Sequence, residues 1–113
     1  MIFEDFLIKT EEGYYCRYGN FFIDAMQPVA HNLISHAHGD HATNGHTHIY
    51  ATEATLAFMR NKFAKLAEQS LRPISFDHSF YMGEVRITFV PAGHMLGSAQ
   101  ILMVYKDIRY LYT

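Results

Sequence analysis

Three histidines and an aspartate lie within six residues, in the stretch 36–41 (His-Ala-His-Gly-Asp-His). Imidazole nitrogens and carboxylate oxygens are the ligands that zinc and similar divalent cations prefer. His36 and His38 are two residues apart, so in an extended segment their side chains point to the same face and can bind one ion. Asp40 and His41 follow on a turn, within reach of a second ion held roughly 3.5–4 Å from the first. The spacing favours a metal site over a histidine-rich surface loop or a tag-like cluster.

A second loop, residues 91–99 (Pro-Ala-Gly-His-Met-Leu-Gly-Ser-Ala), offers another candidate ligand. Gly93 and Gly97 allow the backbone to approach closely on both sides of His94. Considered alone, His94 is more simply a structural or surface histidine. If it converges with His36 and His38, three imidazoles bind one ion and leave a coordination position open to water.

Strands must place these loops. The apolar run Asn32–Ile34 reads as a buried strand, and Gly39 and Asp40 break the pattern directly after it. Asp24 ends the strand before, where its carboxylate is predicted either to orient a ligand imidazole through the second ring nitrogen or simply to form a turn.

One long helix is predicted from Thr52 to Gln69. Thr52 is suited to cap its first turn, and an apolar stripe at helical spacing (Leu56, Met59, Phe63, Leu66) is suited to pack on a sheet. Its basic side chains most simply face water, with a nucleic-acid contact as the alternative. The predicted strands are Ile2–Lys9, Tyr14–Tyr18, Phe21–Asp24, His48–Ala51, Pro73–Phe76, Val85–Val90, Ala99–Tyr105 and Ile108–Tyr112, with a turn at Tyr81–Glu84.

Length and composition fit one small globular domain. The chain has 113 residues, half of them hydrophobic, and a formal net charge of −2, which gives no general attraction to nucleic acid. Its single cysteine, Cys16, excludes an intrachain disulfide. No apolar run is long enough to span a membrane, and Glu4 and Asp5 interrupt the basic-then-apolar pattern of a signal peptide, so we expect a cytoplasmic protein without a membrane partner. Nucleophile elbows and phosphate-binding glycine loops are absent from the sequence, which leaves metal chemistry as the main hypothesis.

The two histidine motifs resemble those of the metallo-β-lactamase superfamily. The first motif, at His36, His38, Asp40 and His41, is specific for the superfamily as a whole. The stretches 22–24 (Phe-Ile-Asp), 34–42 and 92–99 are similar to its nuclease branch, which includes RNA 3′-end-processing factors and ligase-associated DNA repair exonucleases.

The resemblance implies a fold class of α+β, the N-terminal half of a four-layer αββα sandwich. It implies a first zinc on His36, His38 and His94, and a second zinc, or manganese in its place, on Asp40 and His41. Asp40 would also contact the attacking water and so be catalytic. A bridging aspartate, a later histidine and a nucleic-acid-binding cap domain of the family would lie beyond Thr113. We therefore expect residues 1–113 to form a single partial domain, inactive alone, that self-associates through an uncovered sheet face.

The function predicted for the full-length protein is metal-dependent hydrolysis of phosphodiester bonds in DNA or RNA, as an exonuclease in mRNA 3′-end processing or DNA repair. One alternative is a thioester or lactam hydrolase of the same superfamily. Another is a binding module in which the metal is structural.

Overall fold

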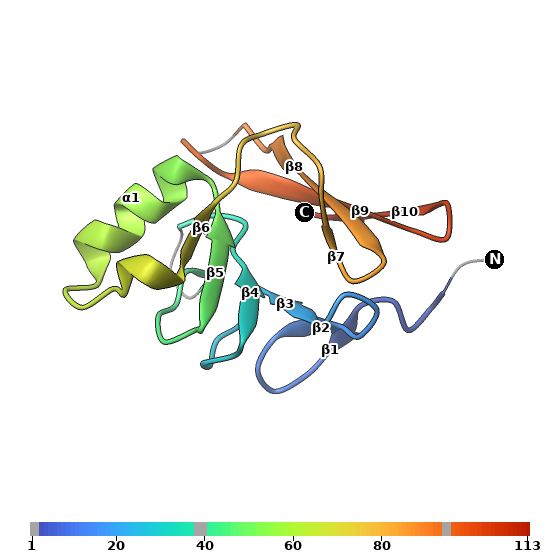
Figure 1. The fold of residues 1–113 in the computed structure, drawn as a ribbon, viewed down its shortest axis with the longest axis horizontal. Coiled ribbons are helices and arrows are strands. Elements are labelled where there is room, and N and C mark those ends of the chain that lie inside the picture. Colours follow the sequence, from blue (N-terminus) through green and yellow to red (C-terminus); the bar gives the residue numbers. More distant parts are fainter. Residues whose placement is uncertain (1–2, 38–40, 94–95) are drawn as a thin grey trace.

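The structure, a computed structural model, describes residues 3–37, 41–93 and 96–113. Two β-sheets face one another, and one α-helix packs on the outer side of the larger sheet (Figure 1). Among the described residues, no helix is long and apolar enough to cross a membrane.

The larger sheet has six strands in sequence order. Strands β1 to β3 pair antiparallel, and β3 to β6 pair parallel. The carboxyl ends of β3, β4 and β5 therefore lie at one edge of the sheet, and the loops that follow them meet there. The strands are β1 (Ile8–Lys9), β2 (Tyr14–Cys16), β3 (Phe21–Ile23), β4 (His31–Leu33), β5 (His48–Ala51) and β6 (Leu71–Pro73).

The smaller sheet is an antiparallel meander in the order β10-β9-β8-β7. Residues of β9 alternate between buried and half-buried along its whole length, because successive side chains point to opposite faces of the sheet. A two-residue turn at Gly83 and Glu84 joins β7 to β8. The strands are β7 (Phe80–Met82), β8 (Val85–Pro91), β9 (Ala99–Tyr105) and β10 (Ile108–Tyr112).

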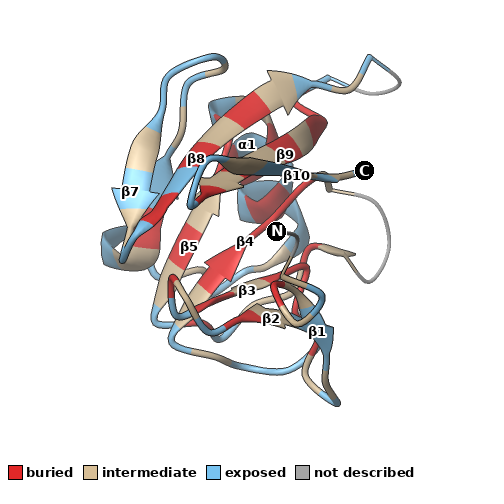
Figure 2. Ribbon diagram, turned by 90° about the vertical axis from the view of Figure 1, so that its right-hand side faces the viewer, coloured by how far each residue is buried: buried red, intermediate tan, exposed pale blue. Residues whose placement is uncertain are grey.

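The main hydrophobic core lies between the two sheets, where the buried residues of β3, β4, β8 and β9 gather (Figure 2). Cys16 is fully buried in this core. Aromatic side chains close one end of it: the rings of Phe6 and Tyr110 stack with centroids 3.8 Å apart. The predicted strand Ile2–Lys9 is accordingly wrong over most of its length, because Phe3 and Phe6 turn inward to this cluster and leave only Ile8–Lys9 to pair with β2.

A second, smaller core lies under helix α1 (Glu53–Lys62). The Thr52 side chain accepts a hydrogen bond from the backbone N–H of Thr55, which caps the first turn as predicted. Leu56 and Met59 are buried against Ile49 and its neighbours on the outer face of β5 and β6. This packing includes Ile34, so it fixes the end of the sheet at which the chain leaves β4 toward His36.

The expected helix Thr52–Gln69 is wrong beyond Lys62. The backbone becomes extended at Phe63 (φ −114°, ψ 113°), and a 3₁₀ turn, η2 (Glu68–Ser70), leads into β6. Because β6 is the edge strand, no sheet surface lies beyond it to bury a longer helix, and helices in water depend on such packing. Phe63 and Leu66 still pack against the small core, but from a non-helical segment.

The expected fold class, an α+β half of an αββα sandwich, is also wrong. The described residues form a small β-rich domain of two sheets with one ten-residue α-helix. No helix in this part of the chain covers the outer face of the smaller sheet, where Leu111 is 54% exposed. The alternating apolar pattern predicted the strands but carried no signal for a second helical layer.

Two further elements lie at other positions than predicted, and β2, β3, β4 and β8 lie within two residues of their predicted bounds. The strand expected at Pro73–Phe76 lies at Leu71–Pro73, because Leu71 pairs with Ile49 and is the residue that the small core buries. Phe80–Met82 form strand β7, so the turn expected at Tyr81–Glu84 is confined to Gly83 and Glu84.

Candidate metal centre

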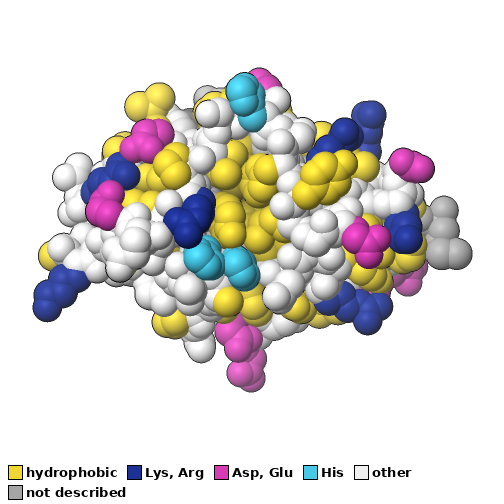
Figure 3. All heavy atoms as spheres, viewed as in Figure 1, with side chains coloured by type: hydrophobic (Ala, Val, Ile, Leu, Met, Phe, Trp, Pro, Cys, Tyr) yellow, Lys and Arg dark blue, Asp and Glu magenta, His cyan; other side chains and the backbone are white. Residues whose placement is uncertain are grey.

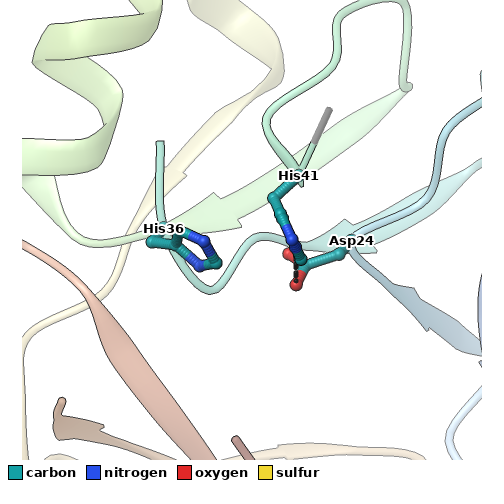
Figure 4. A group of neighbouring side chains, drawn as sticks. All are labelled: Asp24, His36 and His41. Atoms are coloured by element: carbon teal, nitrogen blue, oxygen red, sulfur yellow. Dashed lines mark hydrogen bonds and ion pairs between the residues drawn. The ribbon is translucent and has the colours of Figure 1, made fainter. Parts of the chain in front are cut away.

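Three titratable side chains converge at the edge where β3 and β4 end. Asp24 follows β3, His36 lies three residues beyond β4, and His41 belongs to the loop that follows (Figure 4). One ligand atom from each residue lies within 4.8 Å of the others. His38, Asp40 and His94, the other predicted ligands, lie outside the described residues.

The backbone explains why these residues meet. The N–H of Asp24 donates to the carbonyl of Leu33 (2.8 Å), which extends the pairing of the parallel strands β3 and β4 past their ends. Asp24 itself has a left-handed backbone (φ 50°), a conformation that aspartate tolerates better than most residues, and it turns the side chain back over the strand ends. The carboxylate therefore lies beneath the histidine loop.

Asp24 is the centre of a buried hydrogen-bond network. The carboxylate is 7% exposed, and its Oδ1 accepts from the backbone N–H of Ser35 (2.8 Å). Its Oδ2 accepts from the hydroxyls of Ser35 (2.6 Å) and Tyr112 (3.0 Å) and from Nδ1 of His41 (3.0 Å). Four donors to one carboxylate offset the loss of hydration that burial imposes.

This network assigns the tautomers of both histidines. Nδ1 of His41 donates to a carboxylate oxygen, so it carries the proton and the lone pair lies on Nε2. Ser35 gives its only hydroxyl proton to Asp24, so at its 2.8 Å contact with His36 it accepts from Nδ1. His36 then also has its lone pair on Nε2. Its ring centroid lies 4.3 Å from that of His41.

The donor set fits a divalent metal ion such as zinc. Metal-binding histidines commonly donate the second ring N–H to a carboxylate, which fixes the ring and raises its basicity. His41 has this arrangement directly, and His36 has it through the hydroxyl of Ser35. Asp24 already accepts four hydrogen bonds, so it is better suited to support the two imidazoles than to bind the ion itself.

A hollow of about 160 Å³ lies over this network, and it is lined by both histidines. Ala92, Ala99 and Tyr112 form the opposite wall. The hollow is therefore bounded by β4 and its loop on one side and by the ends of β8, β9 and β10 on the other.

The loop that contains position 94 is anchored beside His36. Ala92 N–H donates to the carbonyl of Ser98 (3.0 Å), and Ala99 N–H donates to the carbonyl of Ser35 (2.7 Å). The carbonyl of Gly97 accepts from the hydroxyl of Thr52 (2.7 Å), which ties the same loop to the start of α1. Both ends of this loop are thus held at the hollow that His36 and His41 line.

His46 connects the segments on either side of β4 through hydrogen bonds to Val29 and Thr43. It is 4% exposed, its Nδ1 accepts from Val29 N–H (3.1 Å), and its Nε2 lies 2.8 Å from the hydroxyl of Thr43. Thr43 in turn donates to the carbonyl of Ala25. Burial lowers the pKa of His46, which keeps this internal histidine neutral.

Sequence reasoning did not identify Ser35 or Tyr112 as parts of the site. Ser35 offered one local signal, since a hydroxyl directly before a candidate ligand can bridge it to a carboxylate. Tyr112 offered none, because 88 residues separate it from Asp24. Burial and the nearby Asp24 carboxylate raise the pKa of Tyr112, so its hydroxyl remains a hydrogen-bond donor.

Comparison with known proteins gives one informative similarity. No protein-family model matches the chain. Over 100 residues, the chain is 31% identical to a protein of Opitutus terrae named "Probable DNA ligase". The match covers 88% of this chain and 10% of that protein, so the chain spans about a tenth of the length of the curated relative it matches.

Proposed function

We propose that this chain provides the metal-binding part of a metal-dependent phosphodiesterase that acts on DNA or RNA, as an exonuclease. The observation that carries the proposal is the shared support of two imidazoles, His36 and His41, by one buried carboxylate beside a hollow of about 160 Å³. The resemblance of both histidine motifs to the nuclease branch of the metallo-β-lactamase superfamily supports the same activity.

Each described residue has a distinct role in this proposal. His36 and His41 would hold zinc, or manganese, through Nε2, and His38, Asp40 and His94 would complete the ligands of two ions. Asp24 accepts a hydrogen bond from Nδ1 of His41, and Ser35 accepts one from Nδ1 of His36. The lone pair of each ring therefore lies on Nε2, the nitrogen proposed to bind the metal. A bound divalent cation lowers the pKa of a coordinated water to near neutrality and stabilises charge on the phosphate oxygens.

Tyr112 and the loop 92–98 shape the space above the ligands. The hydroxyl of Tyr112 orients Asp24, and its ring forms a wall of the hollow. Ala92 and Ala99 present small side chains at the same hollow, which leaves room for a phosphodiester. Position 40, directly before His41, supplies the carboxylate proposed to contact the attacking water.

The proposed substrate class is supported by the similar protein of Opitutus terrae, whose name refers to DNA. Because only a tenth of that protein matches, its name supports a nucleic-acid-related function and no particular reaction. On the face drawn in Figure 3, lysine and arginine side chains are scattered among acidic ones and form no continuous basic patch. Since the chain also has a formal net charge of −2, we assign the attraction for phosphate to the bound cations rather than to this face of the protein.

Metal binding by this chain is the first test. Binding of Co²⁺, followed by its visible absorption, and of Zn²⁺, followed by calorimetry, should be strong in the native chain and lost in His36→Ala/His41→Ala. The control is His31→Ala/His48→Ala, which removes two histidines at the opposite ends of the strands. Equal binding by both double variants would refute the metal centre.

Nuclease activity is the second test. Nucleotide release from single-stranded DNA and RNA should be measured with zinc or manganese, for this chain and for any longer natural protein that contains it. Thioester and lactam substrates should be assayed in parallel. Hydrolysis of the esters but not of nucleic acid, or metal binding with no hydrolysis in any of these proteins, would contradict the proposal.

A further inference from the structure

A second hollow, of about 170 Å³, lies beside the candidate metal centre. It is bounded by the β1–β2 hairpin, the loop after β3 and the end of β10. His41, Asp24 and Tyr112 line this hollow as well as belonging to the hydrogen-bond network of the metal centre. The two hollows therefore share His41 and Tyr112 as lining residues, so they are neighbours and one extended ligand could contact both.

The walls of the second hollow are suited to a flat aromatic group. Tyr14 is 36% exposed and Met26 is 54% exposed, and both line it. The ring of Tyr112 lies edge-on to that of Tyr14, with centroids 5.8 Å apart and planes at 66°. Aromatic rings stack on nucleobases without sequence preference, and a thioether packs well against aromatic rings.

A positively charged side chain, that of Lys9, also lines the hollow. Lys9 pairs with Tyr14 across β1 and β2 and lines the same hollow. No ion pair joins Lys9 to another described residue. Its ammonium group is therefore available to a phosphate that enters with an aromatic group.

The hollow is preformed rather than loosely assembled. The backbone N–H of Met26 donates to the carbonyl of Glu12 (2.6 Å), which fixes the hairpin turn against the loop after β3. Gly13 (φ +147°) approaches this loop so closely that an added Cβ would lie 2.8 Å from the Cα of Ala25. A rigid wall lowers the entropy lost when a ligand is bound.

We propose that this second hollow binds the nucleobase of the terminal nucleotide of a single strand, while the adjoining phosphodiester lies at His36 and His41. The inference rests on the proposed function and adds a base-stacking subsite to it. Tyr14 and Met26 are the stacking surfaces, and Lys9 pairs with phosphate. Stacking explains how a site with little net positive charge on its surface recognises nucleic acid whatever its sequence.

The test compares two probes that differ only in the base, deoxyadenosine 5′-monophosphate and deoxyribose 5-phosphate. Binding to this chain is measured by calorimetry with and without zinc. Native protein should prefer the nucleotide about tenfold, and Tyr14→Ala should remove that preference while leaving deoxyribose 5-phosphate binding unchanged. Tyr14→Phe keeps the ring and should keep the preference.

Tyr81→Ala is the matched control, because Tyr81 is 68% exposed and lies on β7 in the other sheet. It should leave both affinities unchanged. No preference for the nucleotide in native protein, or a preference that survives Tyr14→Ala, would overturn the subsite. Co²⁺ absorption on the same samples separates the two proposals, since loss of metal binding refutes the metal centre and an absent base preference refutes only the subsite.

Discussion

The parallel strands of this domain have a histidine pair at each end, and the two pairs differ in what supports them. At the carboxyl ends, His36 and His41 have ring centroids 4.3 Å apart; at the amino ends, His31 and His48 stack at 4.8 Å. The spacing is similar, but only the first pair lies on a buried carboxylate network.

The second pair is supported by a phenol and by packing. Nδ1 of His31 lies 3.0 Å from the hydroxyl of Tyr50, and the buried Nδ1 of His48 has no hydrogen-bond partner among the described residues. Burial, and then the neighbouring His48, lower the pKa of His31. Two close imidazoles therefore do not make a metal site by themselves; a fixed tautomer and a nearby negative charge distinguish the first pair.

The largest effect should come from removing each pair in turn. His36→Ala/His41→Ala should weaken zinc binding at least about a hundredfold, because the binding free energy of a zinc site is shared among only a few ligands. His31→Ala/His48→Ala should leave zinc binding unchanged. Calorimetry with zinc on both variants decides the matter, and equal losses would show that the carboxylate network makes no difference.

Removing only the charge beneath the first pair sharpens the comparison. Asp24→Asn preserves the shape of the side chain, but it replaces the carboxylate that four donors contact in the native protein with an amide. We expect zinc affinity to fall about 10- to 100-fold, the usual range for a lost supporting partner of a metal-bound histidine. Tyr50→Phe, which removes the hydroxyl beside His31, is the corresponding change at the second pair and should not alter zinc affinity.

Sequence spacing brought together two candidate ligands that the structure also places side by side, His36 and His41, whereas the predicted fold class was wrong. Ligands within six residues of one another need no tertiary information, whereas Tyr112 reaches Asp24 across 88 residues and left no trace in local spacing. Strands β9 and β10 matched their predictions, because two runs rich in apolar and aromatic residues flank the turn residues Lys106 and Asp107, a pattern that signals a hairpin. The helix was overestimated because an apolar stripe does not show where the sheet beneath it ends.

Gly93 and Gly97, in the loop between β8 and β9, test whether the anchoring of that loop matters. The loop lies beside His36 and not beside the amino-end pair, His31 and His48. Gly93 (φ +89°) and Gly97 (φ +84°) both have left-handed backbones, but a Cβ at Gly93 would meet no atom of the described residues within 4 Å. At Gly97 it would lie 2.7 Å from the Cβ of Ala54 and 2.9 Å from Oγ1 of Thr52. Both changes to alanine strain the backbone, and only Gly97→Ala also overpacks the contact with α1.

We therefore expect Gly97→Ala to lower the free energy of unfolding by about 2 kcal/mol more than Gly93→Ala does. Urea denaturation of the two variants measures the difference. Equal destabilisation would mean that the loop shifts away from α1 at little cost, and that its position beside His36 is not held by this contact.

The smallest effect concerns protons, and it separates the histidines that are neutral through burial from the proposed metal ligands. The pKa values of His31 and His46 are lowered below 6.5 in the folded protein, chiefly by burial. As pH falls through 6.5, the unfolded chain takes up protons before these two folded-state groups do, so the free energy of unfolding falls with it. The stability they contribute is fully present above pH 6.5 and is lost progressively below it.

Denaturation of the metal-free protein between pH 7.5 and about pH 5 should show this loss, and His31→Gln should make the profile shallower by removing one of the two groups. His46→Gln also removes a titrating group, but it breaks the contacts to Val29 and Thr43 and so should lower stability at every pH. A profile that His31→Gln leaves unchanged would place the acid sensitivity in His46. The amino-end histidine pair would then make no measurable contribution to the pH dependence, which would widen the difference between the two ends of the strands.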